Sequence, residues 1–375
     1  MLRTFQFRLR PNASQRAAFE RILADNCETY NSALAQRRDA WQSRHRSITY
    51  NDQQARLTEL RKDPQFAIIA CDIQREPLRR VDRAFKAFFR RCKAGEKPGY
   101  PRFRSRDRYD SFGFGNNNVT VRDRSIKVPN VGDIRARGGR PVQGKPKLCT
   151  VKRDGKRWTA SVVCYIGPAP DKRTVSSAVG VDVGLKTLAT LSDGRQIENP
   201  RWVHRHEARI RLASQRLSRN QRGSRNRVRA REVLRRAHQR ATDSRRNYLH
   251  HVSKWLVGRY DLIAFEALNI QSMAKSRLAK SIMDAAWGEL IWQLKYKAEE
   301  AGVWAVPVNP RRTSQLCSGC GGLVEKTLAE RRHVCSCGVD LDRDHNAALN
   351  ILALGRSAAG LEPSKRLQHS RESSI

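Results

Sequence analysis

The sequence lacks any apolar run long enough to cross a lipid bilayer. Its longest apolar stretches, such as the one from Phe66 to Cys71, fall far short of the roughly 20 residues that a membrane helix needs. Residues 1–10 alternate Phe and Leu with Arg, so they lack the continuous apolar core of a secretory signal peptide. We therefore expect a cytoplasmic protein with no membrane partner.

Acidic residues are also scarce. The 375 residues include 36 Asp and Glu against 74 Lys and Arg, which gives a net charge of +38 and a pI near 11.0. Self-repulsion of this size opposes a compact state unless a polyanion neutralises it. Nucleic acid is the polyanion that this charge predicts, because each neutralised phosphate releases condensed counterions. A basic surface that only keeps the protein soluble is the alternative interpretation. The length and the 39% hydrophobic content are sufficient for two or three folded domains.

The cysteines do not form a disulfide framework, because there are nine of them and five are scattered. We expect these five to be small buried hydrophobic residues in a reducing compartment. The scattered residues are Cys27, Cys71, Cys92, Cys149 and Cys164.

The other four cysteines form two close pairs separated by a loop of 14 residues. The first pair is Cys317-x2-Cys320, and the second, Cys335-x-Cys337, is one residue shorter than the usual spacing. Neighbouring glycines permit the tight turns that such pairs need. Four thiolates at this spacing predict a closed tetrahedral Zn²⁺ site that is structural, since no coordination position stays open for catalysis.

Apolar periodicity predicts a helical region followed by short strands in the first half of the chain. Residues 1–10 read as a basic edge strand, and helices continue to about residue 92. Gly and Pro then end the helices, and an Asp154-Gly155 turn predicts a hairpin between the last two strands. The segment from Pro168 to Pro170 is typical of a linker. The strand runs are 111–114, 119–121, 125–128, 147–152 and 158–165.

The second half mixes strands and helices. A helix pair over 201–246, broken near 220–224, carries sixteen Arg and three acids. So many unpartnered arginines favour a phosphate-binding surface over a merely solvated helix face. Charge alone selects the candidate nucleic-acid contacts Arg216, Arg222, Arg225 and Arg229. The other predicted elements are strands at 178–183, 188–191, 260–265 and 303–308, and one amphipathic helix over 281–301.

Three acidic residues lie where a metal-dependent nuclease would need them. Asp182 interrupts an apolar strand, Glu266 closes another, and Asp344 opens a helix, where it would also act as the N-cap. Each acid alone is equally well explained by strand-end solvation, an arginine salt bridge or capping. Together they predict a carboxylate cluster for two Mg²⁺ ions, which would activate water and stabilise the leaving oxygen of a phosphodiester.

Four runs of sequence surround these acids and cysteines: Val179-Gly-Val-Asp-Val-Gly-Leu-Lys186, Leu262-Ile-Ala-Phe-Glu-Ala-Leu-Asn269, Thr313-Ser-Gln-Leu-Cys-Ser-Gly-Cys320 and Cys337-Gly-Val-Asp-Leu-Asp-Arg-Asp-His-Asn-Ala-Ala348. They resemble TnpB, the family of insertion-sequence proteins related to the compact type V CRISPR effectors. The resemblance is strong over about 176–354 and weaker over 1–175. The shortened second cysteine pair and the small helical region depart from the family pattern.

The resemblance implies a multidomain α/β protein that works with a guide RNA. Asp182, Glu266 and Asp344 would be the catalytic acids, and one chain per guide RNA would cleave double-stranded DNA beside a short motif and hold its displaced strand. The implied parts are a wedge-type β-barrel (1–10 and 95–172), a helical recognition domain (11–94), an RNase H-like RuvC nuclease domain (173–312 and 340–356) and a zinc ribbon (313–339). The tail, residues 357–375, is rich in Ser, Arg and Lys, and this composition predicts disorder.

Three other functions use the same features. A guided DNA-binding repressor would not need the three acids. A strand-transfer transposase would also use an RNase H-like site, but we identify no helix-turn-helix for binding the ends of the element. A structural RNA-binding role leaves the acids unexplained. The sequence therefore favours an RNA-guided endonuclease acting on bacterial DNA in the cytoplasm.

Overall fold

The computed structural model describes residues 1–115, 118–138, 141–273, 275–276, 278–327 and 330–361. It divides into two units, Met1–Pro168 and Ala169–Ile375, each with its own sheet. The division falls within the predicted linker. Most of the predicted disordered tail lies outside the described residues, although its first two residues belong to the last helix.

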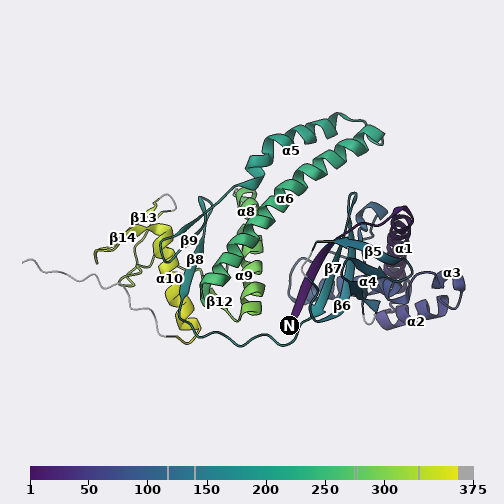
Figure 1. The fold of residues 1–375 in the computed structure, drawn as a ribbon, viewed down its shortest axis with the longest axis horizontal. Helices are drawn as coiled ribbons and strands as arrows, with labels where there is room; N and C mark the ends of the chain where they lie inside the picture. Colours follow the sequence, from purple (N-terminus) through teal and green to yellow (C-terminus); the bar gives the residue numbers. More distant parts are fainter. Residues whose placement is uncertain (116–117, 139–140, 274, 277, 328–329, 362–375) are drawn as a thin grey trace, which may run out of the picture. The chain divides into compact units, whose positions relative to one another are not determined.

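The first unit is built on a seven-stranded sheet with the order β2-β6-β7-β1-β5-β4-β3. Figure 1 labels β5, β6 and β7 of this sheet. β1 lies inside this sheet between β7 and β5, so the predicted edge strand is wrong. Its Phe5, Phe7 and Leu9 are buried in alternation, which suits a central strand with one face on the core. β2 and β3 are the two end strands, and within the described part of the chain they do not pair with each other. The sheet is therefore open. The strands are β1 (Leu2–Leu9), β2 (Ser111–Gly115), β3 (Thr120–Arg122), β4 (Ser125–Val128), β5 (Gly132–Arg137), β6 (Lys145–Asp154) and β7 (Arg157–Tyr165).

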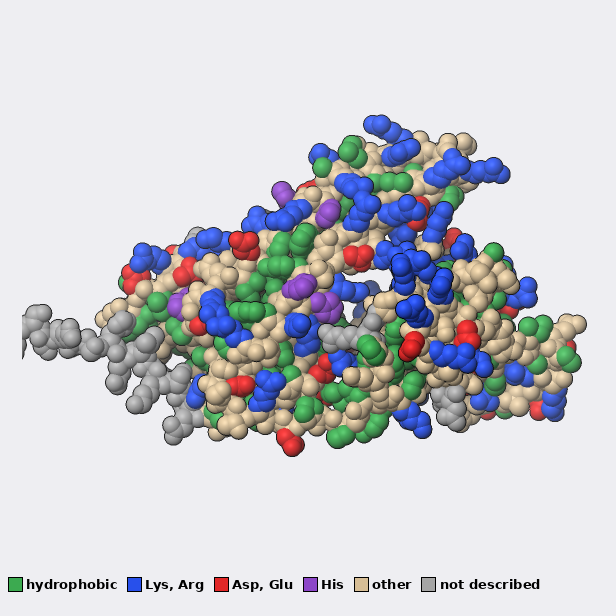
Figure 2. Space-filling view, in the orientation of Figure 1, with side chains coloured by type: hydrophobic (Ala, Val, Ile, Leu, Met, Phe, Trp, Pro, Cys, Tyr) green, Lys and Arg blue, Asp and Glu red, His purple; other side chains and the backbone are tan. Residues whose placement is uncertain are grey.

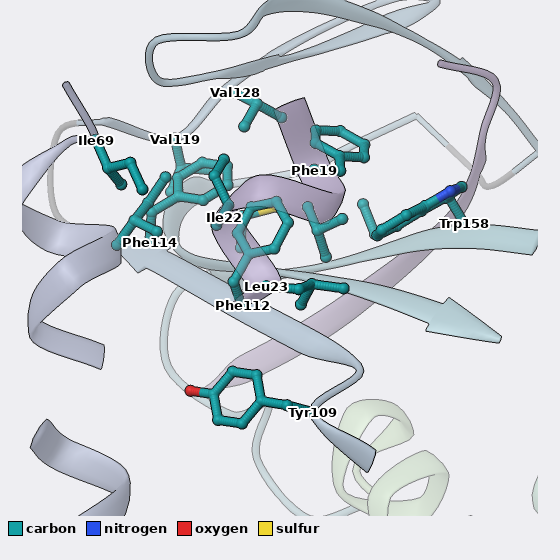
Figure 3. Close-up of a cluster of buried hydrophobic side chains, with 14 of the residues drawn as sticks. Phe19, Ile22, Leu23, Ile69, Tyr109, Phe112, Phe114, Val119, Val128 and Trp158 are labelled. Atoms are coloured by element: carbon teal, nitrogen blue, oxygen red, sulfur yellow. The ribbon is translucent and has the colours of Figure 1, made fainter. Parts of the chain in front are cut away.

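Helices fill the long interval between β1 and β2. The first has Asn12 as its N-cap: the Asn12 side chain accepts from the Gln15 backbone, and the Gln15 side chain accepts from the Asn12 backbone. It buries Phe19 against Phe112 of β2 and Trp158 of β7, with ring centroids 5.4 and 4.9 Å apart (Figure 3). The helices are α1 (Ala13–Arg44), α2 (Tyr50–Leu60), α3 (Pro64–Ala67), α4 (Cys71–Lys93) and the 3₁₀ turn η1 (Arg106–Arg108).

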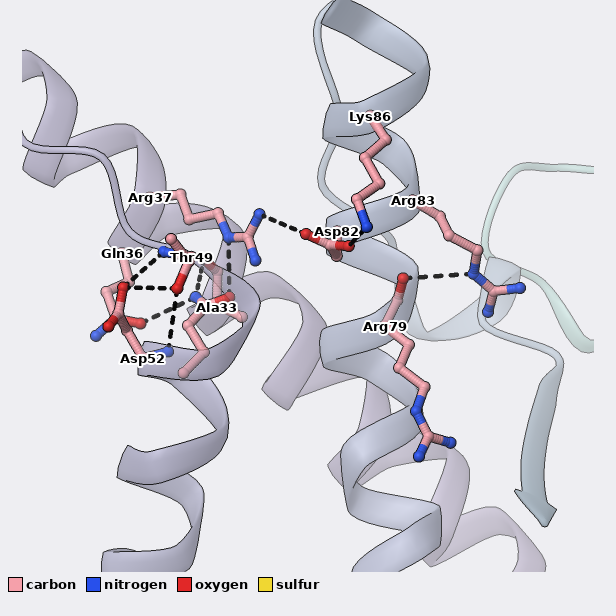
Figure 4. Close-up of polar contacts among 10 residues, drawn as sticks. Ala33, Gln36, Arg37, Thr49, Asp52, Arg79, Asp82, Arg83 and Lys86 are labelled. Carbon is pink, nitrogen blue, oxygen red and sulfur yellow. Dashed lines mark hydrogen bonds and ion pairs between the residues drawn. The ribbon is translucent and has the colours of Figure 1, made fainter. Parts of the chain in front are cut away.

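A buried arginine joins three of these helices. Arg37 of α1 donates to Gln53 of α2 over 2.9 Å and to Asp82 of α4 over 3.5 Å (Figure 4). Asp82 also pairs with Lys86 one turn along α4. Because burial lowers the pKa of Arg37 while Asp82 opposes that shift, the pairing keeps a cation stable inside the helical layer.

The second unit contains a five-stranded mixed sheet with the order β10-β9-β8-β11-β12. β8, β11 and β12 are parallel, whereas β9 and β10 run antiparallel to their neighbours. The predicted strands in this half are confirmed, and so is the break in the arginine-rich helix pair. The strands are β8 (Ala178–Val183), β9 (Thr187–Leu191), β10 (Gln196–Glu198), β11 (Leu262–Glu266) and β12 (Trp304–Val308), with β13 (Arg332–Val334) and β14 (Asp340–Asp342) as a separate pair.

Helices cover both faces of this sheet. Ile263 and Phe265 of β11 pack in the cluster that includes α6 and α9, while Leu262 and Ala264 pack with Ile351 of α10 on the other face. This alternation explains why the central strands read as continuous apolar runs. The helices are α5 (Trp202–Arg219), α6 (Arg225–Arg259), α7 (Ile270–Met273), α8 (Ala279–Ala285), α9 (Trp287–Ala301) and α10 (Arg343–Ala358).

Two sequence predictions need correction here. The single helix expected over 281–301 is broken at Ala286, which has a left-handed φ of 52°. This break seats the buried Trp287, whose indole Nε1 donates to the Gly184 carbonyl over 3.2 Å, so tertiary packing overrides the helical periodicity. Of the five scattered cysteines, Cys92 is exposed and Cys71 is half-buried; only the other three are buried. Among the described residues, the helices include none that is long and apolar enough to cross a membrane.

Candidate active site and metal site

The sheet of the second unit brings two of the predicted acids together. β8 and β11 are parallel neighbours with Val181 opposite Phe265, so Asp182 and Glu266 follow at adjacent positions. Since side chains alternate along a strand, both acids point to the α10 face of the sheet. Asp344 lies in the first turn of α10 and acts electrostatically on Asp182. The structure therefore gathers all three predicted acids at one end of the sheet.

Burial and neighbouring negative charge change the acidity of Asp182, and burial changes that of Glu266. Burial raises the pKa of Asp182 to about 8, and the negative charges of Glu266 and Asp344 add to the effect while Arg343 opposes it. Burial also raises the pKa of Glu266, whereas a hydrogen bond donated by Thr313 Oγ1 lowers it. The positive groups of the protein do not fully balance the negative charge that these carboxylates would carry. Their oxygen donors and unbalanced charge fit hard divalent cations such as Mg²⁺.

The N-cap of α10 is Asp342, so the prediction that Asp344 caps this helix is wrong. The Asp342 side chain accepts from the backbone N–H groups of Asp344 and His345, over 2.9 and 3.3 Å. Capping by Asp342 leaves the Asp344 carboxylate available to the cluster, where Arg343 Nε donates to it over 3.2 Å. The helix begins at Arg343, so the residue placed to accept from its free backbone amides is Asp342, two positions before Asp344.

Several residues that support this site escape sequence reasoning. Thr313, which donates to Glu266, is 47 positions away along the chain. A methyl group on Gly180 would overlap the Ala348 carbonyl, and one on Gly355 would overlap the Ala264 side chain. These two glycines let α10 approach β8 and β11 closely enough to present Asp344. Neither has a left-handed φ, so no turn pattern marks them.

The four paired cysteines also converge. Their Sγ atoms all lie within 4.8 Å of one another, and the Cys317–Cys337 and Cys320–Cys335 pairs are each 3.6 Å apart. These separations are far too long for disulfides and close to the edge of about 3.8 Å expected for four sulfurs around Zn²⁺ at 2.3 Å. Within the described ranges, these four sulfurs lie close enough together to hold one metal ion, whereas the carboxylates of Asp182, Glu266 and Asp344 do not form such a group.

Turns and a short hairpin shape the cysteine cluster. Gly321 and Gly338 have positive φ angles of 79° and 95°, and Gly319 packs so closely that a methyl group there would lie 2.6 Å from Val339. The shortened pair lies between β13 and β14, where a hydrogen bond from the Cys337 backbone lowers the pKa of Cys335. The pKa of Cys337 shifts the other way, because a backbone hydrogen bond from Val339 is outweighed by burial and by contact with the other three thiols, so Cys335 is the thiol of this pair that loses its proton first. A lowered thiol pKa favours the thiolate that binds metal.

The predicted arginine contacts lie on a helical hairpin formed by α5 and α6. Figure 2 shows Lys and Arg side chains along this hairpin, at the top of the view. Arg227 closes the turn by donating to the carbonyls of Leu217 and Asn220 over 2.9 and 2.8 Å. The four predicted residues are exposed: Arg216 near the end of α5, Arg222 in the turn, and Arg225 and Arg229 at the start of α6.

Three family models match parts of the chain. A "Probable transposase" model matches residues 161–277, and a "Cas12f1-like, TNB domain" model matches residues 287–351. A "Helix-turn-helix domain" model matches residues 1–46, a match that the residue patterns alone did not predict. In the structure, however, those residues form β1 and the single 32-residue helix α1, with no second helix after a turn.

Relatives match over nearly the whole chain. A "Putative RNA-guided DNA endonuclease" of Streptomyces pristinaespiralis is 34% identical, with 100% of this chain and 95% of the relative covered. "Putative RNA-guided DNA endonuclease InsQ" of Escherichia coli (strain K12) is 29% identical, with 95% and 93% covered. A chain from the "Cryo-EM structure of the Cas12f1-sgRNA-target DNA complex" shares the fold with a TM-score of 0.57 at 15% identity, over 90% of this chain and 82% of that one.

Proposed function

Because the chain belongs to the TnpB family of RNA-guided DNA endonucleases, we propose that it cleaves double-stranded target DNA next to a short recognition motif. The observation that carries the proposal is the convergence of Asp182, Glu266 and Asp344 at one end of the second unit's sheet. Guide pairing would select the sequence, while the protein would read duplex shape and the adjacent motif. One chain per guide RNA would act on bacterial DNA in the cytoplasm.

The three acids would hold two Mg²⁺ ions. When bound, these ions would supply an activated water and charge stabilisation for the leaving oxygen. The protein's own part is to fix the donors: strand ends hold Asp182 and Glu266, and the start of α10 holds Asp344. Thr313 orients Glu266, and Arg343 holds Asp344. These contacts keep the carboxylates in place before substrate arrives.

For the remaining parts of the chain, the proposal assigns the domains that the family resemblance implies. The five-stranded sheet with α6 and α9 on one face and α10 on the other supports an RNase H-like RuvC domain. The cysteine cluster supports a structural zinc ribbon. The seven-stranded sheet with its helical insertion supports the wedge and recognition domains. The exposed arginines of the α5–α6 hairpin support contact with nucleic-acid phosphates.

Guided cleavage tests the proposal directly. RNA that co-purifies with the protein should be a discrete scaffold with a variable 3′ guide, and the complex should linearise a plasmid carrying the matching target and motif. Asp182→Ala should abolish cleavage while target binding persists. Glu299→Gln, which changes an exposed acid on α9, is the matched control and should cut normally.

The same assay separates the alternatives. Target binding without cleavage by the wild-type complex would indicate a guided repressor. Joined DNA ends in place of free ends would indicate a strand-transfer transposase. Random host RNA in the purified protein would contradict the guided mechanism as a whole.

A further inference from the structure

The first unit contains a small arginine-lined pocket that none of the proposed roles uses. Its volume is about 320 Å³, at the lower end of the range of about 300–1,000 Å³ typical of small-ligand sites. Two of its arginines come from consecutive turns of α4, and two come from the segment that leads into β2. The residues that matter here are Arg80, Arg83, Arg104, Arg108 and Tyr109.

Tyr109 brings an unused hydrogen-bond donor to this pocket. The residue is only 2% exposed, and within the described part of the chain its hydroxyl has no hydrogen-bond partner. Figure 3 shows the Tyr109 ring apart from the other labelled side chains of the buried cluster. The Arg80 guanidinium lies over the ring, 4.9 Å from its centroid. A buried hydroxyl without a partner is costly in a folded protein, so this one requires a water molecule, an ion or a ligand that accepts its hydrogen.

The charges around Tyr109 define the ligand as an anion. Arg80 and Arg83 share one carboxylate, Glu76, over 2.6 and 3.3 Å. Arg104 and Arg108 are exposed, and among the described residues neither forms an ion pair. Asp110 also lines the pocket, so four guanidinium groups face two carboxylates, Glu76 and Asp110, and a positive excess remains. Planar guanidinium groups with a hydroxyl donor suit the oxygens of a phosphate.

Aromatic rings beside the pocket indicate that the phosphate belongs to a nucleic-acid strand. Ala84 lines the pocket, and Phe88 follows one helical turn later on the same face of α4. The ring of Tyr100 packs against Phe88 with centroids 5.4 Å apart, yet Tyr100 remains 45% exposed. Phe89, in contact with Phe88, is 55% exposed. Exposed rings next to a cationic groove are how proteins stack unpaired bases.

We propose that this pocket binds one backbone phosphate of a single-stranded nucleic acid, and that the Phe88–Tyr100 ring cluster stacks an adjacent base. The inference rests on the proposed function, which supplies single strands of two kinds: unpaired guide RNA and displaced DNA. Phosphate and base stacking are chemistry that both strands share. Comparing RNA and DNA identifies which of them occupies the site.

The first experiment removes one oxygen atom. Tyr109→Phe keeps the buried ring and deletes the hydroxyl, and Tyr165→Phe removes a hydroxyl from an exposed tyrosine on β7 as the matched control. Affinities of the full-length variants are measured by fluorescence anisotropy with 12-nucleotide RNA and DNA single strands. Loss of a hydrogen bond to a charged phosphate should weaken binding by about tenfold for at least one strand type. Equal affinities of Tyr109→Phe and wild type for both strands would overturn the proposal.

Thermal unfolding distinguishes binding from damage to the fold. Without nucleic acid, Tyr109→Phe should melt at the wild-type temperature or above it, because it removes a buried donor that has no partner. Arg108→Ala should lower the slope of log affinity against log salt by about 0.7, the value for one contacted phosphate on a single strand. The variant that combines Tyr109→Phe and Arg108→Ala should lose less affinity than the product of the two single-variant losses, since both residues would contact one phosphate. Independent, multiplicative losses would count against a shared site.

Base stacking has a signature of its own. A strand carrying 2-aminopurine should lose fluorescence when its modified base stacks on the ring cluster, and Tyr100→Leu should restore the fluorescence. Unchanged fluorescence with every position of the modified base would refute the stacking part. These binding measurements need no guided cleavage, so failure of the nuclease assay and failure of this site are separately visible.

Discussion

At the scale of single residues, the second unit concentrates unfavourable charge at Asp182. The pKa of this carboxyl is about 8 in the fold against 3.8 ordinarily, because burial and two neighbouring acids disfavour its ionised form. A carboxyl group with a raised pKa binds its proton more tightly when folded. It therefore reduces the free energy of unfolding as the pH rises from about 4 to about 8. Such a cost is typical of functional sites.

Asp182→Asn should remove this cost along with activity. In buffer with a chelator, the variant should match the wild type near pH 4 and become progressively more stable than it up to about pH 8, by several degrees in melting temperature. Thermal unfolding across this pH range is the measurement. Added Mg²⁺ should narrow the difference, since only the wild type keeps the full set of carboxylates. A constant difference at all pH values would contradict the assigned origin.

A second aspartate provides a control of opposite sign. Asp261 accepts hydrogen bonds from the side chains of Ser176 and Ser177, which lower its pKa to about 2. Stability from a carboxyl with a lowered pKa is present above its ordinary pKa and is lost as the pH falls from about 4 to about 2. Asp261→Asn should therefore destabilise the protein at neutral pH, by about 1 kcal/mol, and the difference should shrink in acid.

The cysteine cluster makes a prediction about metal content. The purified protein should contain about one Zn²⁺ per chain, measured by elemental analysis. Cys335→Ser should lose most of that zinc on dialysis against a chelator, because three thiolates leave the tetrahedral site incomplete. Cys92→Ser, which alters an exposed cysteine outside the cluster, should keep its zinc. Equal zinc in both variants would show that the cluster is not the site.

At the scale of elements, the close packing of α10 on β8 and β11 decides where Asp344 lies. Gly355→Ala introduces a methyl group that overlaps Ala264, so the helix must shift away from the sheet. We expect a loss of about 1–3 kcal/mol in stability and a fall in cleavage rate of about 100-fold. Chemical denaturation and single-turnover cleavage measure the two effects.

The matched control for this prediction lies in α6. A methyl group on Gly258 would meet no atom within 4 Å, so Gly258→Ala should stabilise the helix by up to about 1 kcal/mol and leave cleavage intact. If Gly355→Ala cleaved DNA at the wild-type rate, the contact between Gly355 and Ala264 would not be what positions Asp344. Both substitutions are glycine to alanine within a helix, so only the local space differs.

At the scale of the whole molecule, two units have separate cores. The cluster of the first unit draws on residues up to Ile166, and the clusters of the second begin at Val175. Fragments 1–168 and 169–375 should therefore each unfold cooperatively when expressed alone, as measured by circular dichroism. The second fragment should retain the zinc. A fragment that shows no cooperative transition would indicate that its core depends on the other unit.

Much of the element order follows from the sequence, because local patterns control it. Asp154-Gly155 predicts the β6–β7 hairpin, and the glycine adopts a φ of 58°. The arginine-rich pair breaks where expected, between α5 and α6. Predictions fail where distant contacts override local preference. Ala286 leaves the helix to seat Trp287, and β1 becomes a central strand because β5 and β7 return to it from more than 120 residues away.

The same division applies to the acid cluster. The sequence by itself determined which residue types carry the chemistry: acids that interrupt apolar strands, cysteines in close pairs, and an excess of arginine. These signals are local, so they can be recognised in one sequence without the structure. Only the tertiary structure decided that Asp342 caps α10, that Thr313 holds Glu266, and that Asp344 approaches Asp182. Those relations depend on parallel strand pairing and on helix-to-sheet contact between residues far apart in the chain, which no local pattern encodes.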